Sequence, residues 1–238
     1  MKSDTRINDQ ERWNKTLSKI THSIKNKRGI YRKPIDYDME LVLKYILHIG
    51  LGYCDNFIID KINKPIIQQM IKYFYADPTF EGDLKKGILI HGPKGTGKTL
   101  LFIIFKDLIS IFNLNKKSSK NINFQISRTS NVVEKFERNG HEAIIQYRSK
   151  PYLFDDLGEE NKNSMFYKNE SNVMADIILD RSLKFIQHGL LTHATSNYLI
   201  KDTIKNKEWF KDFYGARVSD RMIEMFNMIK LEGESRRK

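Results

Sequence analysis

The sequence has 238 residues, a formal net charge of +12 and a single cysteine, Cys54. One cysteine cannot form an intramolecular disulfide or a cysteine-rich zinc site, and no stretch approaches the roughly 18 consecutive apolar residues that a membrane span needs. These features argue against a secreted disulfide scaffold and against an inserted protein. They predict a cytoplasmic protein without a membrane partner, in which Cys54 fills a buried position.

Basic residues concentrate at the start of the chain. Residues 1–34 contain ten Lys or Arg against three Asp or Glu, a net charge of +7. With no sustained apolar stripe, this segment is predicted to be a flexible basic arm with a short helix over residues 13–24. Its charge suits the phosphates of DNA, although a merely solubilising tail explains the composition equally well.

Residues 35–80 form a second predicted region, a small helical module. Apolar residues recur at helical spacing from residue 42, and Gly50 and Gly52 are placed to end this first helix. A second helix over residues 64–75 carries Pro65 in its first turn. A compact module with apolar helix faces suits a protein partner.

From residue 81 onwards, apolar strand patterns alternate with helical patterns, which predicts an α/β domain with a parallel sheet flanked by helices on both faces. Residues 116–120 and 159–172 are predicted to be solvated loops. The predicted strands cover residues 87–90, 122–126, 152–154, 190–195 and 228–231, and the predicted helices cover residues 98–111, 130–145, 171–187 and 216–226.

A glycine-rich motif follows the first of these strands and opens the first of these helices. It matches the P-loop pattern GxxxxGK[ST] and consists of Gly92, Pro93, Lys94, Gly95, Thr96, Gly97, Lys98 and Thr99, followed by Leu100. The glycines let backbone N–H groups surround a phosphate, the lysine reaches the β and γ phosphates, and the threonine hydroxyl binds Mg²⁺. The motif therefore predicts an ATP and Mg²⁺ site.

Two carboxylates end a later apolar strand, as in a Walker B segment. Asp155 is expected to hold the Mg²⁺ shell through water, and Asp156 to orient or deprotonate the attacking water. Adjacent carboxylates repel each other unless a cation lies between them. A plain surface Asp-Asp turn is the alternative.

Another strand ends at Asn197, which is placed to form a hydrogen bond with the γ phosphate or the attacking water, although an Asn at a strand end is more often a turn residue.

These three strand ends, followed by the segment Arg217-Val218-Ser219-Asp220-Arg221 and by Ser235-Arg236-Arg237, resemble the AAA+ ATPases. The likeness is to the DnaC/DnaI-type helicase loaders and the IstB-type transposition helpers, and it covers about residues 63–238. It implies a P-loop NTPase (AAA+) sheet in an ATPase domain over residues 81–238. Because the sequence stops soon after the last predicted strand, no large C-terminal lid is expected.

The resemblance also implies roles for individual residues. Asn197 is similar in position to sensor 1, Arg221 to the arginine finger with Arg217 beside it, and Arg237 or Arg236 to the sensor 2 arginine. A finger completes the ATP site of a neighbouring subunit, so an ATP-dependent homo-oligomer is expected. The alternative is that Arg217 and Arg221 only form a solvated helix face. Arg181 falls where this family often has an arginine that contacts a neighbour or DNA.

The predicted function is that of a slow, assembly-dependent ATPase acting on DNA, most simply a DnaC-like loader that grips single-stranded DNA and holds a replicative helicase. An IstB-like helper that recruits a transposase is the alternative, because the ATPase residues do not separate the two. A small-molecule kinase is disfavoured, since no arginine-rich lid segment is present between the late elements.

Overall fold

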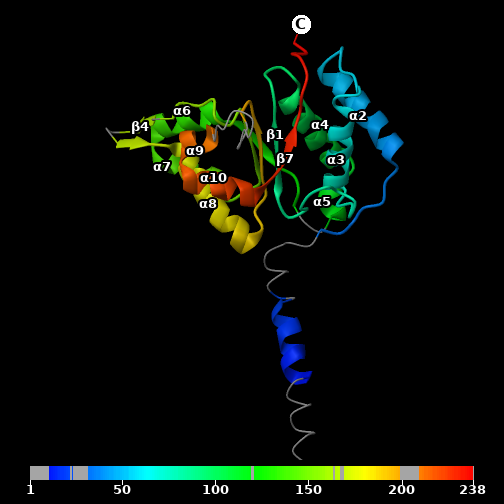
Figure 1. Ribbon diagram of the computed structural model, residues 1–238, viewed down its shortest axis with the longest axis horizontal. Helices are drawn as coiled ribbons and strands as arrows, with labels where there is room; N and C mark the ends of the chain where they lie inside the picture. The colour runs from blue at the N-terminus through cyan, green and yellow to red at the C-terminus, as the bar shows by residue number, and fades with distance from the viewer. Residues whose placement is uncertain are drawn as a thin grey trace, which may run out of the picture.

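The computed structural model describes residues 11–21, 23, 32–118, 121–162, 164–166, 169–198 and 209–237. Within these ranges the chain forms one five-stranded sheet covered by helices, together with a separate two-stranded hairpin (Figure 1). None of the helices in these ranges combines the length and apolarity needed to span a bilayer.

All five strands of the central sheet are parallel, in the order β2-β3-β6-β1-β7. The strands are β1 (Gly87–His91), β2 (Gln125–Arg128), β3 (Tyr152–Asp155), β6 (Thr192–Ser196) and β7 (Phe226–Lys230). Because parallel strands end on the same side, the carboxyl ends of β1, β3 and β6 meet at one edge of the sheet, which is where such sheets bind ligands.

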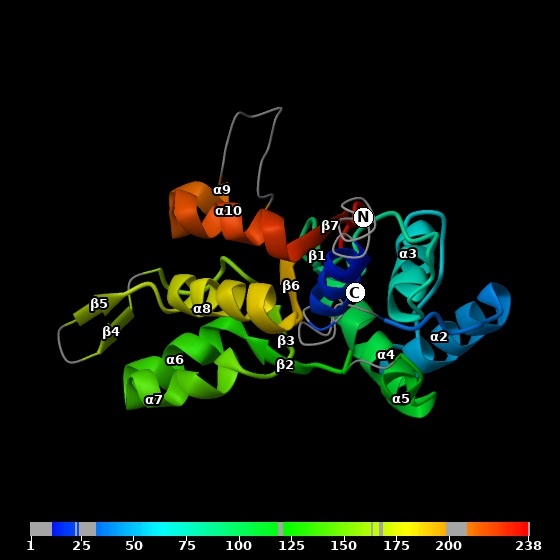
Figure 2. The same ribbon diagram turned by 90° about the horizontal axis from the view of Figure 1, so that it is seen from below.

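Helices cover both faces of this sheet (Figure 2). One layer contains α2 (Met39–Tyr53), α3 (Lys64–Phe74), α4 (Lys98–Ile111) and α5 (Leu114–Lys117). The other contains α6 (Thr129–Asn139), α7 (His141–Ile144), α8 (Val173–His188), α9 (Trp209–Tyr214) and α10 (Ala216–Met225), with a 3-10 turn at Ile145–Arg148. The predicted α/β architecture is confirmed.

Alternating strand residues build two hydrophobic cores, one under each helical layer. Ile88 and Ile90 of β1 pack with α3 and α4, whereas Leu89 faces α8 and α10. On β3, Leu153 joins the first core and Phe154 joins the second. Apolar residues on both faces are what a fully covered parallel strand requires. The sheet is thereby held rigidly beneath the loops at its carboxyl edge.

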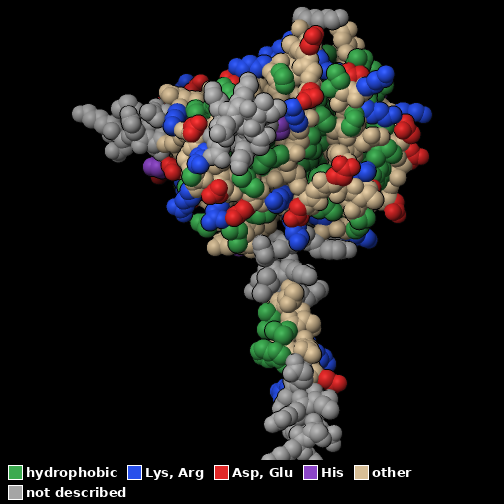
Figure 3. Space-filling view, in the orientation of Figure 1, with side chains coloured by type: hydrophobic (Ala, Val, Ile, Leu, Met, Phe, Trp, Pro, Cys, Tyr) green, Lys and Arg blue, Asp and Glu red, His purple; other side chains and the backbone are tan. Residues whose placement is uncertain are grey.

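The segment before α2 has two distinct parts. Residues 11–21 form a helix whose apolar side chains are exposed: Trp13 is 58% and Leu17 42% exposed. Figure 3 shows these hydrophobic side chains gathered on one side of that helix. Arg32, predicted to belong to the basic arm, is instead buried, and its Nη2 donates to the carbonyls of Tyr73 (2.5 Å) and Phe74 (3.0 Å). From Arg32 onwards the chain is packed against α3.

The end of α2 differs from the prediction. The helix continues through Gly50 to Tyr53, because Gly50 serves packing rather than termination: a Cβ there would lie 2.1 Å from the ring of Phe57. The prediction that Cys54 is buried is also wrong. Cys54 is the extended C-cap of α2 and is exposed, while Phe57 occupies the buried position against the helix.

Three further boundaries were misplaced. Residues 122–124 are not strand. The side-chain oxygen of Asn115 accepts hydrogen bonds from the N–H groups of Ile122 and Asn123, at 2.8 and 2.9 Å, so these groups are not available to a neighbouring strand. The helix predicted for residues 130–145 breaks at Gly140, which has φ +67°. The predicted loop over residues 159–172 contains a hairpin, β4 (Ser164–Phe166) and β5 (Asn169–Ser171).

Candidate nucleotide-binding site

The loop between β1 and α4 has the backbone of an anion-binding cradle. Gly95 and Gly97 adopt φ +82° and +97°, conformations that other residues rarely reach. Gly97 is the N-cap of α4 and offers no side-chain acceptor, so the first N–H groups of that helix are left without the usual capping bond. A phosphate fits such a helix start, because aligned N–H groups and the helix dipole both favour negative charge.

Lys98 lies in this cradle and is 5% exposed. Its Nζ donates to the carbonyls of Gly92 and Pro93 and to Oδ1 of Asn197, each at 2.8 Å. Burial lowers the pKa of Lys98, against the opposing influence of Asp156 and Asp155. A buried ammonium whose acceptors are mostly neutral favours an anionic ligand, and a phosphate chain supplies that charge.

The hydroxyl of Thr99 donates to Oδ1 of Asp155 at 2.6 Å. The same carboxylate oxygen accepts from the Thr195 hydroxyl at 2.7 Å, which fixes its orientation. Hydroxyl and carboxylate oxygens at this separation are hard ligands of the kind that Mg²⁺ prefers. The two residues predicted to serve the metal are thus adjacent, and their donor set fits Mg²⁺.

Asp156 is held in the left-handed region, at φ +58°, which is unusual for a residue with a side chain. Its N–H donates to Oγ1 of Thr195 and its carbonyl accepts from Oγ1 of Thr129, each at 2.9 Å. Burial, and next the charge of Asp155, raise the pKa of Asp156, whereas Arg128 lowers it. Asp156 lies on the wall of a pocket, where a general base must be to reach a bound water.

Two charged residues at the site were not predicted from the sequence. Arg128, at the end of β2, lies with Nε 3.7 Å from Oδ2 of Asp156. Glu159 accepts from Lys94 Nζ at 2.9 Å and from Asn197 Nδ2 at 3.0 Å. Although burial opposes it, hydrogen bonds from Asn197, Lys94 and Tyr198 lower the pKa of Glu159. Glu159 thus joins the P-loop to the end of β6.

Lys98, Thr99, Arg128, Asp156, Glu159 and Asn197 line one pocket of about 850 Å³, and Asp155 lies behind Thr99, to which it is hydrogen-bonded. The pocket extends from Lys98 and Asp156 to an apolar end that includes Cys54 and Ile58. The P-loop residues on its wall are Lys94, Gly95, Thr96, Gly97, Lys98, Thr99 and Leu100. Arg236 and Arg237 line the same pocket, as the sequence predicts for one of them. A phosphate end next to an apolar end matches the outline of a nucleotide.

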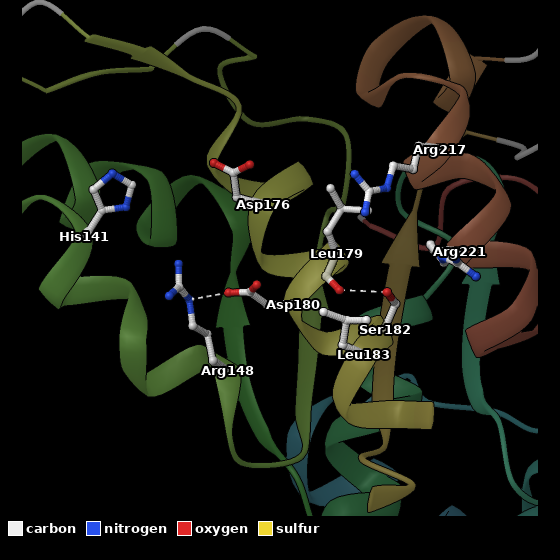
Figure 4. Close-up of a pocket in the computed structure, with 9 residues that line it drawn as sticks. All are labelled: His141, Arg148, Asp176, Leu179, Asp180, Ser182, Leu183, Arg217 and Arg221. Carbon is white, nitrogen blue, oxygen red and sulfur yellow. Dashed lines mark hydrogen bonds and ion pairs between the residues drawn. The ribbon is translucent and has the colours of Figure 1, made fainter. Parts of the chain in front are cut away.

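Arg217 and Arg221 lie elsewhere. They line a separate hollow of about 430 Å³ over α8, whose wall also includes Leu183 of α8 and His141 of α7. Figure 4 shows the side chain of Arg217 pointing from α10 toward α8. Arg221 is paired with Glu224 through its Nη1 at 2.6 Å. Neither arginine lines the pocket around Lys98 in its own chain.

The interpretation of Arg181 as a surface contact residue is wrong. Arg181 is fully buried, and burial lowers its pKa to about 9. Its guanidinium donates to Thr192 Oγ1 at 2.9 Å and to the carbonyls of Leu191 at 2.8 Å, Lys150 at 3.0 Å and Tyr147. Arg181 satisfies carbonyls before β3 and β6 and cannot reach DNA or a neighbour.

No protein-family model matches the chain, and no curated protein matches it. Solved structures match at the level of fold. A primosome component from Streptococcus pyogenes serotype M3 has a TM-score of 0.53 at 20% identity, over 82% of this chain and 91% of its own. DnaI has a TM-score of 0.51 at 18% identity, over 89% and 99% of the two chains.

A DNA replication initiation factor also matches, with a TM-score of 0.51 at 14% identity, over 76% of this chain and 49% of its own. Identities this low carry information about fold alone. The five-stranded parallel sheet with its flanking helices is the α/β P-loop fold of the AAA+ proteins.

Proposed function

We propose that this chain is an ATP-binding and ATP-hydrolysing protein that acts on DNA, most specifically as a DnaC-like loader of a replicative helicase. The observation that carries the proposal is that Lys98, Asn197 and Thr99 line one pocket and that Asp155 is hydrogen-bonded to Thr99, so that groups from three strand ends meet there. Each side chain has the chemistry that one part of Mg·ATP needs.

Within this proposal each residue has a distinct task. The N–H groups of the P-loop bind the phosphates and Lys98 neutralises their charge. Thr99 and Asp155 would hold Mg²⁺, which would supply charge neutralisation at the phosphate oxygens. Asp156 accepts a proton from the attacking water, and Asn197 donates to the γ phosphate or to that water.

Hydrolysis is proposed to need a second copy of the chain. Arg221, with Arg217 beside it, lies on α10 outside the nucleotide pocket, so its positive charge can reach a γ phosphate only across an interface. An ATP-dependent homo-oligomer follows from this arrangement. Turnover should therefore rise with protein concentration.

Nucleotide binding can be tested with the chain's own cysteine. Cys54 is the single cysteine, is exposed and lines the nucleotide pocket. Mg·ATP should therefore slow alkylation of Cys54 by a thiol reagent, and the Lys98→Ala variant should lose this protection. Equal alkylation rates with and without Mg·ATP in the wild type would contradict the proposal.

The choice of partner rests on the likeness to the primosome component and to the DNA replication initiation factor, which supports replication over transposition. The test is complex formation between the full chain, with Mg·ATP, and either a replicative helicase or a transposase. ATP-dependent capture of the helicase alone supports the loader. Capture of the transposase alone would overturn the loader proposal and support the IstB-like alternative.

DNA binding is proposed to use the basic arm. Because Arg32 is part of the packed structure, the truncation that tests the arm should remove residues 1–31 only. Binding to single-stranded DNA should weaken steeply with salt, and the truncation should reduce the slope of log K against log salt by several units. An unchanged slope would show that the arm does not contact phosphates.

A further inference from the structure

The segment that follows β7, residues 231–237, turns back along the nucleotide site, and we call it the tail. Figure 1 shows it leaving β7 and running beside the loop after β1. The N–H of Leu231 donates to the carbonyl of His91 at 2.8 Å, and the N–H of Arg236 donates to the carbonyl of Gly95 at 2.9 Å. The tail is therefore bonded to the strand before the P-loop and to the P-loop itself.

The close approach of the tail explains one P-loop glycine. A Cβ on Gly95 would lie 2.2 Å from Oγ and 2.9 Å from Cβ of Ser235, distances that side chains cannot adopt. Gly233, at φ +116°, makes the bend that directs the tail there. The side chain of Ser235 thus fills the space that the absence of a side chain at Gly95 leaves.

Beyond the P-loop the tail reaches the helical region at the other side of the pocket. Nη2 of Arg236 lies 2.7 Å from Oδ2 of Asp60, with side chains 31% and 29% exposed. The other oxygen of Asp60 accepts from the N–H groups of Ile62 at 2.9 Å and Asn63 at 3.0 Å. Because both oxygens have partners, Asp60 is a fixed anchor before α3.

The pKa of Asp60 is consistent with this ion pair. Burial alone would raise the pKa of Asp60, but the hydrogen bonds from Asn63, Arg236 and Ile62 outweigh it and lower the pKa. The ion pair is therefore formed at neutral pH and is lost only as Asp60 takes up a proton in acid. Arg237 has no such carboxylate partner among the described residues, and it lines the same pocket as Lys98.

We propose that the Arg236–Asp60 ion pair is a clasp that closes the nucleotide site between the tail and the loop before α3. The clasp rests on the proposed nucleotide function and deepens it. Arg236 is a positioning residue, since its guanidinium is engaged by Asp60, and Arg237 is the arginine that contacts the phosphates. Because Arg236 lines the pocket, the clasp holds one wall of the nucleotide site in place and should slow release of the nucleotide.

The clasp also joins the site to the rest of the molecule. Asp60 precedes α3, which belongs to the helical region proposed to bind the protein partner. The ion pair therefore links one wall of the nucleotide pocket to the region proposed to bind the protein partner.

The test is the dissociation rate of a fluorescent N-methylanthraniloyl ATP with Mg²⁺ from the full chain. Arg236→Ala and Asp60→Asn should each accelerate release about three- to tenfold, the effect of losing one partly exposed charged hydrogen bond. Asp60→Asn retains an oxygen for the N–H groups of Ile62 and Asn63, so the fold is preserved. Arg236→Lys should recover part of the slow release, because it keeps the charge.

Two comparisons separate the clasp from a general loss of stability. The Asp60→Asn/Arg236→Ala double variant should release nucleotide no faster than either single variant, since one interaction cannot be lost twice. Glu232→Ala, which removes the exposed Lys230–Glu232 pair on the same segment, should release at the wild-type rate. The nucleotide-free thermal midpoint should be nearly the same in all variants.

The outcomes distinguish the two levels of the proposal. Failure of the wild type to bind the probe would overturn the nucleotide function and the clasp with it. Tight binding by the wild type together with unchanged release from Arg236→Ala and Asp60→Asn would overturn the clasp alone. Additive acceleration in the double variant would also overturn it, because the two residues would then act independently.

Discussion

The ammonium group of Lys98 lies 2.8 Å from the side-chain oxygen of Asn197, although the two residues are 99 positions apart in the sequence. They meet because β1 and β6 are parallel neighbours whose carboxyl ends lie side by side. The amide group of the same asparagine donates to Glu159. Asn197 therefore connects the P-loop, the end of β6 and the loop after β3.

Replacing Asn197 should separate binding from hydrolysis. Asn197→Ala should lower kcat about tenfold to a hundredfold while changing ATP affinity less than about threefold, because a donor aimed at the reacting phosphate acts mainly in the transition state. Steady-state ATPase assays with an independent binding titration measure both quantities. Asn139→Ala, at an exposed position on α6, is the matched control. Equal losses of binding and turnover would contradict a sensor role.

The pH profile should identify Asp156 as the base. A base must be ionised, so hydrolysis should rise with pH through the raised pKa of Asp156. Arg128 lowers that pKa, and Arg128→Gln should therefore move the acidic limb to higher pH. Arg138→Gln, at an exposed arginine of α6, should leave the profile in place. A limb that moves to lower pH in Arg128→Gln would exclude this assignment.

Replacing Arg181 should lower the stability of the fold without a direct effect on DNA binding. Arg181→Met leaves Thr192 and the carbonyls around Arg181 without partners, and it should lower the free energy of unfolding by about 2–5 kcal/mol. Urea titration measures this. Arg138→Met is the surface control, with an expected change within about 0.5 kcal/mol. Unchanged stability with lost DNA binding would restore the surface interpretation.

The finger arginine can be tested by mixing two inactive variants. Arg221→Ala keeps an intact P-loop and Lys98→Ala keeps an intact finger, so mixed assemblies contain some complete sites. ATPase activity should reappear on mixing and should depend on protein concentration. If the mixture stays inactive where the wild type assembles, Arg221 does not act in trans, and Arg217, one turn earlier, becomes the residue to test.

The parts of the site that the sequence predicted are the local ones. The P-loop, the acidic end of β3 and the polar end of β6 are each encoded within a few consecutive residues, and alternating elements place them on one sheet edge. Glu159 could not be found in this way, because its partners Lys94 and Asn197 are 65 and 38 positions away and its neighbours are polar.

Arg128 was missed for a different reason. The buried residues Ile122 and Phe124 give the alternating apolar pattern of a strand. The side chain of Asn115, however, accepts hydrogen bonds from the N–H groups that a strand would use for pairing. The true strand begins at Gln125, which moves Arg128 to the carboxyl edge beside Asp156. Tertiary hydrogen bonding by one asparagine thus decided a boundary that periodicity placed elsewhere.

The central claim is that the pocket around Lys98 binds Mg·ATP. The most direct measurement is a calorimetric titration of the full chain and of Lys98→Ala with a non-hydrolysable ATP analogue and Mg²⁺, with circular dichroism spectra of both proteins. The account predicts saturable binding by the wild type, loss of binding in Lys98→Ala and identical spectra, because Lys98 neutralises phosphate charge and is not needed for the core. Equal affinity of the two folded proteins would contradict it.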